Sequence, residues 1–306
     1  MNTTKISVIV PCYNEEQTVN NFYQAITLLW AERTEQLELL FIDDGSTDTT
    51  LEKLRALSST DSRVRYTAFS RNFGKESAIF CGLKQSTGDA VIVMDADLQH
   101  PVSSIPAMLE KHSEGYDIVE GIKSSRGDES ATHGLMARIF YKLMSNMIGF
   151  DMSNSSDYKL LDRQVVDILN SMSESKVFFR ALSFWVGFKS TSVEYEVAKR
   201  SAGTTKWSTK SLVKYALSNL TSYTFVPLHM ISILGAIILI LGIVLGIDAV
   251  ITYFMGKSTS GYPSLVVLIV LATGAIMCSL GVIAVYIAKI FDEVKDRPRY
   301  IVKETK

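Results

Sequence analysis

Two long uncharged stretches near the C-terminus constrain this chain more than any other feature. Residues 230–247 and 264–288 contain no charged side chain. With a rise of about 1.5 Å per residue, helices over these stretches can cross a hydrocarbon core of about 30 Å. A buried helix of a soluble protein does not need so long an uncharged run. The sequence therefore predicts a transmembrane hairpin over 227–290, with helices at about 228–254 and 264–289.

The basic residues around this hairpin predict its orientation. The connecting segment 255–263 carries one basic residue, Lys257. The flanks are richer, with Lys199, Arg200, Lys206, Lys210 and Lys214 before the hairpin and Lys289, Lys295, Arg297, Arg299, Lys303 and Lys306 after it. Because cytoplasmic segments are enriched in Lys and Arg, we predict a multi-pass protein of the cell (inner) membrane. Its N-terminal domain, both termini and a basic tail at 291–306 are then cytoplasmic. Asp248 is expected near the outer interface, the alternative being a functional role inside the membrane.

Strands and helices alternate through the N-terminal part of the chain. The predicted strands are the apolar, β-branched runs at 5–11, 37–43, 64–69, 90–94 and 117–121. This alternation predicts an α/β domain over 1–205, Rossmann-like, with helices on both faces of a mostly parallel sheet. An amphipathic juxtamembrane segment at 206–226 is predicted to follow. In such sheets ligands bind beyond the carboxyl ends of the strands, where the pairs Asp43/Asp44 and Asp95/Asp97 lie.

Charge and cysteine content narrow the classes of partner and site. The chain has 31 basic and 32 acidic residues, for a formal net charge of -1. Nucleic-acid-binding proteins carry a clear basic excess, so no nucleic-acid partner is expected. The three cysteines form no closely spaced pair, which argues against a disulfide framework or a structural zinc site. The N-terminus leads directly into the strand at 5–11, and no signal peptide is predicted.

Asp95 and Asp97 stand one residue apart, directly after the strand at 90–94. Two carboxylates so placed can bind a hard divalent cation together, while substrate phosphates and water complete its coordination. Such a cation neutralises a diphosphate leaving group. We therefore predict Mg²⁺ or Mn²⁺ at this strand end. The alternative is that the two aspartates are only solvated or form a turn.

Several further segments, in a fixed order, resemble a known family. They are PCYNEE (11–16), DDGSTD (43–48), RNFGKE (71–76), MDADLQHP (94–101), DYKLLDR (157–163), FFR (178–180) and WVGFK (185–189). The first two, with the Asp95/Asp97 pair, resemble the donor pocket of family 2 glycosyltransferases, which have the GT-A fold. The others resemble the polyprenyl-phosphate branch of that family. It includes dolichol-phosphate mannose synthases and GtrB-type bactoprenol (undecaprenyl-phosphate) glucosyltransferases, and with its two C-terminal spans the chain is similar to the latter over nearly its full length.

The resemblance implies roles for individual residues. The base and ribose are expected to contact Pro11, Tyr13, Glu15, Ile42 and Asp44. Asp44 is expected to accept hydrogen bonds from uracil or ribose, and its alternative role is a helix cap or turn. Asp95 and Ala96 are expected to lie against the nucleotide. Asp97 and Gln99, together with Asp95, are expected to hold the metal.

Three basic residues are expected to bind phosphates. They are Arg126, Arg200 and Lys206. For Arg200 and Lys206 the resemblance implies a mobile loop that grips phosphates, and contact with anionic lipid is the alternative. Lys123 stands where the family pattern has an arginine three residues before Arg126. The sequence departs from the family at this position. Because lysine binds phosphate as a point charge rather than as a fork, the resemblance supports binding of the acceptor phosphate there less strongly.

Asp157 and Asp97 are the expected catalytic residues. The resemblance makes Asp157 either a base or a group that orients the acceptor. A lipid monophosphate has a second pKa of about 6, so its attacking oxygen is largely deprotonated at neutral pH without help. We therefore favour a positioning role for Asp157, toward the acceptor phosphate or the metal. The alternative is a surface carboxylate paired with Lys159 or Arg163.

The expected reaction is an inverting transfer of a sugar from a UDP-sugar to undecaprenyl or another polyprenyl phosphate. UDP-glucose is the first choice of donor, with N-acetylglucosamine, galactose or mannose donors as alternatives. A polymer-extending transferase is disfavoured, because the chain has few spans and no Gln-x-x-Arg-Trp motif. The alternative outside enzymes is a membrane scaffold with a degenerate donor domain.

The expected partners follow from this reaction. The chain is expected to work in a lipid bilayer with a separate flippase and a downstream transferase, because a two-helix hairpin forms no obvious translocation path. Glycines at 235, 242 and 246 could let the membrane helices pack closely in a homo-oligomer.

Overall fold

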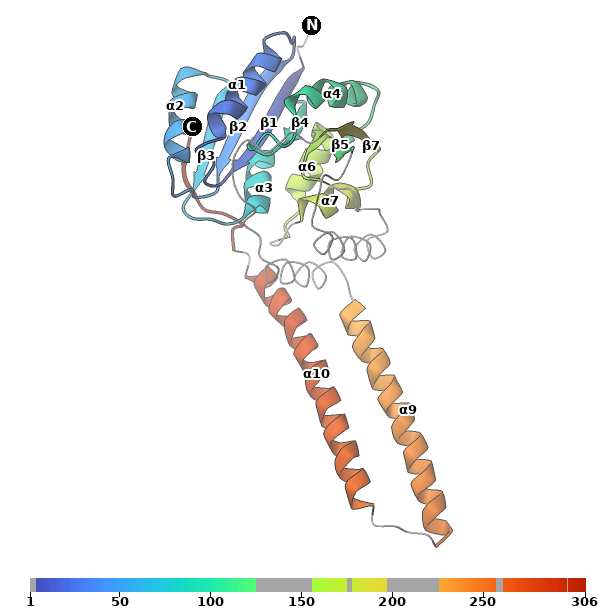
Figure 1. The fold of residues 1–306 in the computed structure, drawn as a ribbon. Helices are drawn as coiled ribbons and strands as arrows, with labels where there is room; N and C mark the ends of the chain where they lie inside the picture. Colours follow the sequence, from blue (N-terminus) through green and yellow to red (C-terminus); the bar gives the residue numbers. More distant parts are fainter. Residues whose placement is uncertain (1–3, 125–155, 175–177, 197–225, 257–260, 296) are drawn as a thin grey trace. The chain divides into compact units, whose positions relative to one another are not determined.

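A computed structural model describes residues 4–124, 156–174, 178–196, 226–256, 261–295 and 297–306. The chain divides into two compact units. Residues 1–208 and 298–306 form one, here called the sheet unit, and residues 209–297 form the other, here called the hairpin unit. The colours of Figure 1 follow the chain through both units.

The sheet unit alternates strands with helices, as the sequence predicts. Its first half contains β1 (Lys5–Cys12), α1 (Val19–Trp30), β2 (Gln36–Asp43), α2 (Thr50–Thr60), β3 (Val64–Phe69), α3 (Lys75–Gln85) and β4 (Ala90–Val93). It continues with a short 3₁₀ turn (Val102–Ser104), α4 (Ile105–Ser113), β5 (Ile118–Lys123), β6 (Lys159–Asp162), α6 (Arg163–Ser171), α7 (Phe179–Trp185), β7 (Ser190–Tyr195) and β8 (Val302–Thr305).

The strands form one eight-stranded sheet in the order β7-β5-β6-β4-β1-β2-β3-β8. β1 pairs in parallel with β2 and β4, β2 with β3, and β5 with β7. β6 runs antiparallel to both β4 and β5, and β8 runs antiparallel to β3. The expected α/β fold with a mostly parallel sheet is therefore confirmed, with two strands reversed.

Helices cover both faces of the sheet because side chains alternate along each strand. Val8 and Val10 of β1 pack in a cluster with α1, α2 and α4. Ile9, between them, points to the opposite face and packs in a second cluster with α3, α6 and α7. Figure 1 shows the two helical layers on either side of the strands. A strand buried on both faces explains why the β1 sequence is a continuous apolar run.

The last residues of the chain belong to the sheet, which was not predicted from the sequence. Residues 291–306 were expected to form a basic tail, yet α10 continues to Val294 and β8 pairs with the edge strand β3. Arg55 of α2 donates to both oxygens of Glu304 (2.8 and 2.6 Å), and the Tyr66 hydroxyl donates to the same carboxylate (3.0 Å). The Tyr300 ring stacks on Phe69 with centroids 4.8 Å apart.

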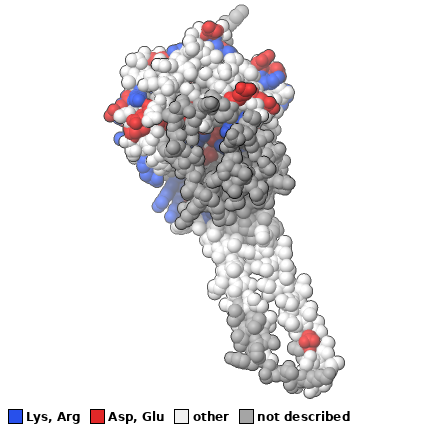
Figure 2. Space-filling view, in the orientation of Figure 1, with Lys and Arg blue, Asp and Glu red and all other residues white. Residues whose placement is uncertain are grey.

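The hairpin unit consists of two long helices, α9 (Val226–Phe254) and α10 (Tyr262–Val294). Spans within them, Met230–Phe254 and Leu271–Val294, have mean hydropathy of 2.9 and 2.1 and present their side chains outward. Figure 2 shows these helices almost free of charged atoms, whereas Lys, Arg, Asp and Glu are frequent on the sheet unit. Both helices are long and apolar enough to cross a membrane.

Candidate active site

The reversed strand β6 brings two distant aspartates together. Val93 at the end of β4 pairs with Lys159 at the start of β6. Because β6 is antiparallel, its beginning lies at the same edge of the sheet as the carboxyl ends of the parallel strands. Asp95 follows β4 by two residues, and Asp157 precedes β6 by two. A site built from both ends is therefore a consequence of the topology.

Lys75 connects these two aspartates. It is the first residue of α3, and its ammonium lies 2.6 Å from Asp95 Oδ1 and 2.8 Å from Asp157 Oδ2. Partial burial lowers the pKa of Lys75, but the two carboxylates outweigh it and raise that pKa. No role was predicted for Lys75 from the sequence, although it lies within the segment 71–76 that carries the family resemblance.

Arg180 holds the other side of Asp157. Its Nε donates to Asp157 Oδ1 (2.6 Å) and its Nη2 to Oδ2 (3.0 Å), a two-pronged arrangement that suits a guanidinium and a carboxylate. Burial raises the pKa of Asp157, but the charges of Lys75 and Arg180 outweigh it and hold that pKa far below its ordinary value. A carboxylate that is ionised so firmly is a weak base, which favours positioning over proton abstraction.

The surface pairing considered for Asp157 does not occur. Lys159 is fully buried and donates to Glu120 Oε1 (2.8 Å), with its ammonium 4.3 Å from the Phe184 ring centre. Glu120 also accepts from the backbone N–H of Ser156 (2.8 Å). The Glu120–Lys159 pair thus holds the chain on both sides of Asp157. Arg163 instead donates through Nε to the carbonyl of Gly88 (2.8 Å).

Glu76 lies behind this cluster and joins α3 to α7. Its Oε2 accepts from the backbone N–H of Phe179 at 2.8 Å. Burial, reinforced by the negative charge of Asp157, raises the pKa of Glu76 to about 7. Glu76 therefore fixes the start of the helix that carries Arg180.

The Asp95–Gln99 segment forms a tight turn. Asp97 Oδ1 accepts from the backbone N–H of Gln99 (3.0 Å), and Leu98 has a positive φ of 60°. The Asp95 side chain is 30% exposed, whereas Ala96 is buried. The predicted metal ligands Asp95, Asp97 and Gln99 thus lie in one loop.

The donor atoms of this loop fit the predicted metal. Within the described ranges, no group of three or more His, Cys, Asp or Glu side chains could hold a metal ion by itself. Two carboxylates and an amide oxygen are hard ligands of the kind that Mg²⁺ and Mn²⁺ accept, with oxygens of substrate and water in the remaining positions. Asp95 is shared with Lys75, and any metal has to compete with that ammonium.

Two buried polar atoms beside this loop lack a hydrogen-bond partner in the described part of the chain: His100 Nδ1 and the Tyr195 hydroxyl. The His100 ring stacks on Tyr158 (centroids 5.0 Å apart) and meets Tyr195 edge-on (5.7 Å). Burial lowers the pKa of His100, and burial together with Asp95 raises the pKa of Tyr195 to about 12. Both side chains are therefore neutral at pH 7.

The loops after β1 and β2 interlock where the base and ribose are expected. The Asn14 N–H donates to Ser46 Oγ (2.9 Å), Asn14 Oδ1 accepts from the Thr47 N–H (2.8 Å), and the Glu15 N–H donates to Thr50 Oγ1 (2.9 Å). Asn14 reaches this position with a positive φ of 55°. Pro11, Tyr13 and Glu15 are all partly or largely accessible in this region.

The Asp44 carboxylate accepts hydrogen bonds from the backbone of the protein. Its two carboxylate oxygens accept from the backbone N–H groups of Phe73 (2.6 Å) and Gly74 (2.9 Å), and its side chain is buried. A Cβ on the neighbouring Gly45 would lie 2.4 Å from the Arg71 backbone, so the two segments touch. Asp44 therefore fixes the backbone just before Lys75 through contacts with a distant segment, and these contacts are neither the local helix cap nor the turn considered from the sequence.

The remaining predicted site residues differ in exposure, and some lie outside the described ranges. Ile42 is fully buried in the core, so its side chain is not accessible to a ligand. Lys123 ends β5 with an exposed side chain. Arg126, Arg200 and Lys206 lie outside the described residues. Their roles, and the base or ribose contacts of Pro11, Tyr13, Glu15, Ile42 and Asp44, stay predictions.

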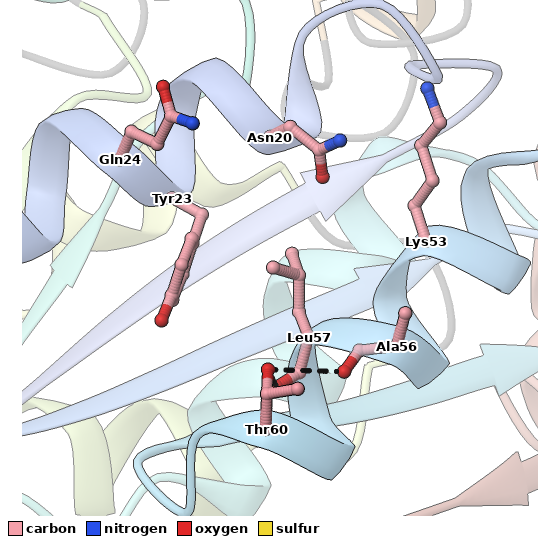
Figure 3. A pocket seen from close by; sticks show the side chains of 7 residues that line it. All are labelled: Asn20, Tyr23, Gln24, Lys53, Ala56, Leu57 and Thr60. Carbon is pink, nitrogen blue, oxygen red and sulfur yellow. Dashed lines mark hydrogen bonds between the residues drawn. The ribbon is translucent and has the colours of Figure 1, made fainter.

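A shallow groove of about 370 Å³ lies elsewhere, between α1 and α2. It is lined by Asn20, Tyr23, Gln24, Lys53, Ala56, Leu57 and Thr60 (Figure 3). The predicted site residues are absent from this lining. The groove is therefore separate from the Asp95–Asp157 centre.

Comparisons with known proteins identify the family. The sequence profile described as "Glycosyl transferase family 2" matches residues 7–168. A Bacillus subtilis (strain 168) protein named "Uncharacterized glycosyltransferase YkcC" is 38% identical over 98% of this chain and 93% of its own length. The "Prophage bactoprenol glucosyl transferase homolog" of Escherichia coli (strain K12) is 36% identical, with 99% of each chain covered.

Solved structures show the same fold. Glucosyl-3-phosphoglycerate synthase from Mycobacterium tuberculosis in complex with UDP superposes with a TM-score of 0.52, at 19% identity over 72% of this chain and 79% of the synthase. Its complex with Mn²⁺, UDP and phosphoglyceric acid gives a TM-score of 0.50, at 17% identity over 71% and 76% of the two chains. At this identity the likeness concerns the fold alone. The family profile and the near-full-length relatives together show that the chain belongs to glycosyl transferase family 2 and is a glycosyltransferase.

Proposed function

We propose that the protein transfers a sugar from a nucleotide-sugar to a polyprenyl phosphate, giving a lipid-phosphate-linked monosaccharide. The observation that carries this proposal is the centre in which Asp157 lies ionised between Lys75 and Arg180, beside Asp95. Such a centre suits a reaction between two phosphate-bearing substrates, because it fixes cations where their negative charges meet. The near-full-length similarity to a bactoprenol glucosyl transferase homolog supports a polyprenyl phosphate as the acceptor.

UDP-glucose is the proposed donor. The relative's name includes glucosyl transfer, and the mycobacterial synthase of the same fold binds UDP. Donors of N-acetylglucosamine, galactose or mannose are the alternatives. Selectivity among these sugars depends on a few hydrogen bonds in the pocket. The unpartnered His100 Nδ1 and Tyr195 hydroxyl are candidates for such bonds.

The proposed reaction is a single in-line displacement. An oxygen of the acceptor phosphate attacks the anomeric carbon, the bond from that carbon to the diphosphate breaks, and the configuration inverts. Asp157 holds Arg180 in place toward the acceptor and takes up no proton itself. Asp95, Asp97 and Gln99 would hold Mg²⁺ or Mn²⁺, which supplies charge neutralisation for the diphosphate; the synthase of the same fold has been solved with Mn²⁺ and UDP.

The two apolar helices support a membrane location for this reaction. We propose a cell (inner) membrane protein with the sheet unit and both termini in the cytoplasm, in keeping with the basic flanks of the hairpin. An acceptor confined to the same bilayer meets the enzyme in a plane rather than in three dimensions. A separate flippase and a downstream transferase would then use the product, and the hairpin could also mediate homo-oligomerisation.

A transfer assay tests this function. Purified protein in detergent is incubated with undecaprenyl phosphate, Mg²⁺ or Mn²⁺ and a panel of nucleotide-sugars, and mass spectrometry detects the lipid product. Asp97→Asn should abolish the product, while Asp167→Asn, an exposed carboxylate of α6, should not. A product from one donor identifies the sugar.

The negative outcomes are also informative. Metal-dependent nucleotide binding without a lipid product from any donor would contradict the polyprenyl-phosphate acceptor. If neither nucleotide binding nor a product is detected, the enzyme proposal is wrong for this acceptor and donor class, and the degenerate scaffold is favoured instead.

A further inference from the structure

Lys75 is shared between the aspartate expected to bind metal and the aspartate expected to position the acceptor. Its ammonium lies 2.6 Å from Asp95 Oδ1, 2.9 Å from Asp95 Oδ2 and 2.8 Å from Asp157 Oδ2. Both oxygens of Asp95 are therefore within hydrogen-bond distance of one cation. The Lys75 side chain is 39% exposed and Asp95 is 30% exposed, so a ligand from solvent can reach both.

The position of Lys75 on its helix is unfavourable for a lysine. As the first residue of α3, it places a positive charge at the helix end where the backbone dipole favours negative charge. Asp44 holds the two backbone N–H groups just before it, so this start of the helix is fixed. The two aspartates, rather than the helix, account for a cation at this position.

Metal binding at Asp95 conflicts with this arrangement. Oxygen ligands lie about 2.0–2.6 Å from divalent cations such as Mg²⁺ and Ca²⁺. A divalent cation bound to Asp95 would therefore lie next to the Lys75 ammonium. Two cations on one carboxylate repel each other, and Asp95 cannot serve both fully. The flexible Lys75 side chain is the partner that can move, because Asp157 is held independently by Arg180.

We propose that Lys75 changes its partner during the reaction. In the free enzyme its ammonium pairs with Asp95, and when a metal ion binds Asp95 the ammonium moves to the diphosphate of the donor. This inference rests on the proposed function, since it assumes a nucleoside diphosphate donor with a divalent cation. The ammonium keeps its protons throughout and forms no covalent bond. It first suppresses metal binding in the absence of donor, and it then stabilises the negative charge that develops on the leaving diphosphate.

The first test is metal binding without nucleotide. Mn²⁺ is titrated by calorimetry into the full-length protein in detergent, as wild type and as Lys75→Met. The variant should bind Mn²⁺ about tenfold more tightly, since about 1.4 kcal/mol of removed charge repulsion corresponds to that factor. Lys84→Met, an exposed lysine in the last turn of the same helix, is the matched control and should match wild type. Unchanged or weaker Mn²⁺ binding by Lys75→Met would overturn the exchange.

The second test separates binding from turnover. In the transfer assay, Lys75→Met should lower kcat by about a hundredfold, the size expected when one charge contact to the transition state is lost. The KM for the donor should change much less. Lys75→Arg, which keeps the charge, should recover part of kcat. An equal loss of kcat in Lys75→Met, Lys75→Arg and Lys84→Met would indicate a structural effect and contradict the proposal.

Failure of the inference can be told apart from failure of the proposed function. The Mn²⁺ titration needs neither donor nor acceptor, so it reports on Lys75 even when no lipid product forms. If Lys75→Met does not fold, Lys75→Gln replaces it in the same titration, with circular dichroism and thermal unfolding as the check. Transfer by wild type with no tightening of Mn²⁺ binding in either neutral variant would reject the exchange and leave the proposed function standing.

Discussion

Around Asp157, burial and two neighbouring cations act on one carboxylate in opposite directions. Burial favours the neutral acid, while Lys75 and Arg180 favour the anion and prevail, so the pKa of Asp157 lies well below its ordinary value. A base works best when its pKa is near the operating pH. The carboxylate is therefore suited to holding two cations in place and poorly suited to accepting a proton.

The pH dependence of transfer follows from this. The acid limb of the kcat profile should follow the acceptor phosphate, with an apparent pKa of about 6. Asp157→Asn should lower kcat by about a hundredfold, because the cations lose their anchor, yet leave that limb in place. Rates from pH 5 to 8 with both proteins provide the measurement. Disappearance of the limb in Asp157→Asn would instead identify Asp157 as the base.

Because its pKa is raised, Glu76 lowers the free energy of unfolding as pH rises, whereas a salt-bridged acid with a lowered pKa increases it. Burial and the charge of Asp157 raise its pKa from 4.5 to about 7 in the folded protein. Its favourable contribution is present below about pH 4.5 and is lost as pH rises through about 7. Glu76→Gln retains an acceptor for the Phe179 N–H and cannot ionise. The variant should be more stable than wild type at pH 8, by up to about 3 kcal/mol, and similar near pH 5.

Thermal unfolding at both pH values measures this difference. Glu110→Gln, an exposed carboxylate of α4, is the control and should change stability by less than about 0.5 kcal/mol. A Glu76→Gln protein that is less stable than wild type at pH 8 would show that the ionised carboxylate is needed there.

Single residues also show where sequence reasoning reaches its limit. Asp95 and Asp97 could be selected because they are neighbours at a strand end. Lys75 and Asp157 are 82 residues apart, and their contact depends on the pairing of β6. A positive charge at the start of α3, where the backbone dipole disfavours it, is the feature that marks Lys75. Arg180 lay within a segment that resembles the family, yet its partner could not be inferred.

Among the elements, the apolar strands and the long apolar helices could be predicted, whereas β6, β7 and β8 could not. The alternation of strands and helices up to residue 121 and the two apolar helices follow from residue patterns. β6 and β8 have four residues each and contain charged residues, unlike the equally short but wholly apolar β4, and their direction is set by distant partners. β8 also has mostly exposed side chains, so its sequence resembles a polar tail.

Strand β8 covers an edge that would otherwise be open. Removal of residues 302–306 should expose the backbone of β3, lower the unfolding temperature by several degrees and promote aggregation. Glu304→Gln removes the charge from the partly exposed pair with Arg55 but keeps an acceptor for the Tyr66 hydroxyl, and should cost less than about 1 kcal/mol. Thermal unfolding and light scattering compare the two. Equal behaviour of the truncated and full-length proteins would mean that the pairing adds no stability.

At the scale of the whole molecule, the chain leaves the sheet unit after residue 208 and returns to it at residue 298. One folded sheet cannot lie on both sides of a membrane. If both helices span a membrane, as proposed, the two ends of the hairpin lie on the same side, and a pair of spans, rather than one, satisfies this requirement. Connectivity thus supports, independently of the basic flanks, the part of the proposal that places both ends on one side.

Labelling of introduced cysteines tests this topology. In intact cells, an impermeant thiol reagent should modify Ser258→Cys, in the segment between the helices. Lys303→Cys, exposed on β8, should react only after lysis. The native Cys12 and Cys81 are buried in the folded protein and should react little. Labelling of both introduced cysteines in intact cells would contradict the arrangement.

The return of the chain to the sheet also imposes an order on biosynthesis. β8 is the last strand to emerge from the ribosome, and both apolar helices precede it in the chain. Until then, the edge of β3 remains without its final partner. Completion of the sheet therefore follows synthesis of both apolar helices, and a nascent chain that stalls before residue 302 would carry an open edge on an otherwise nearly finished enzyme.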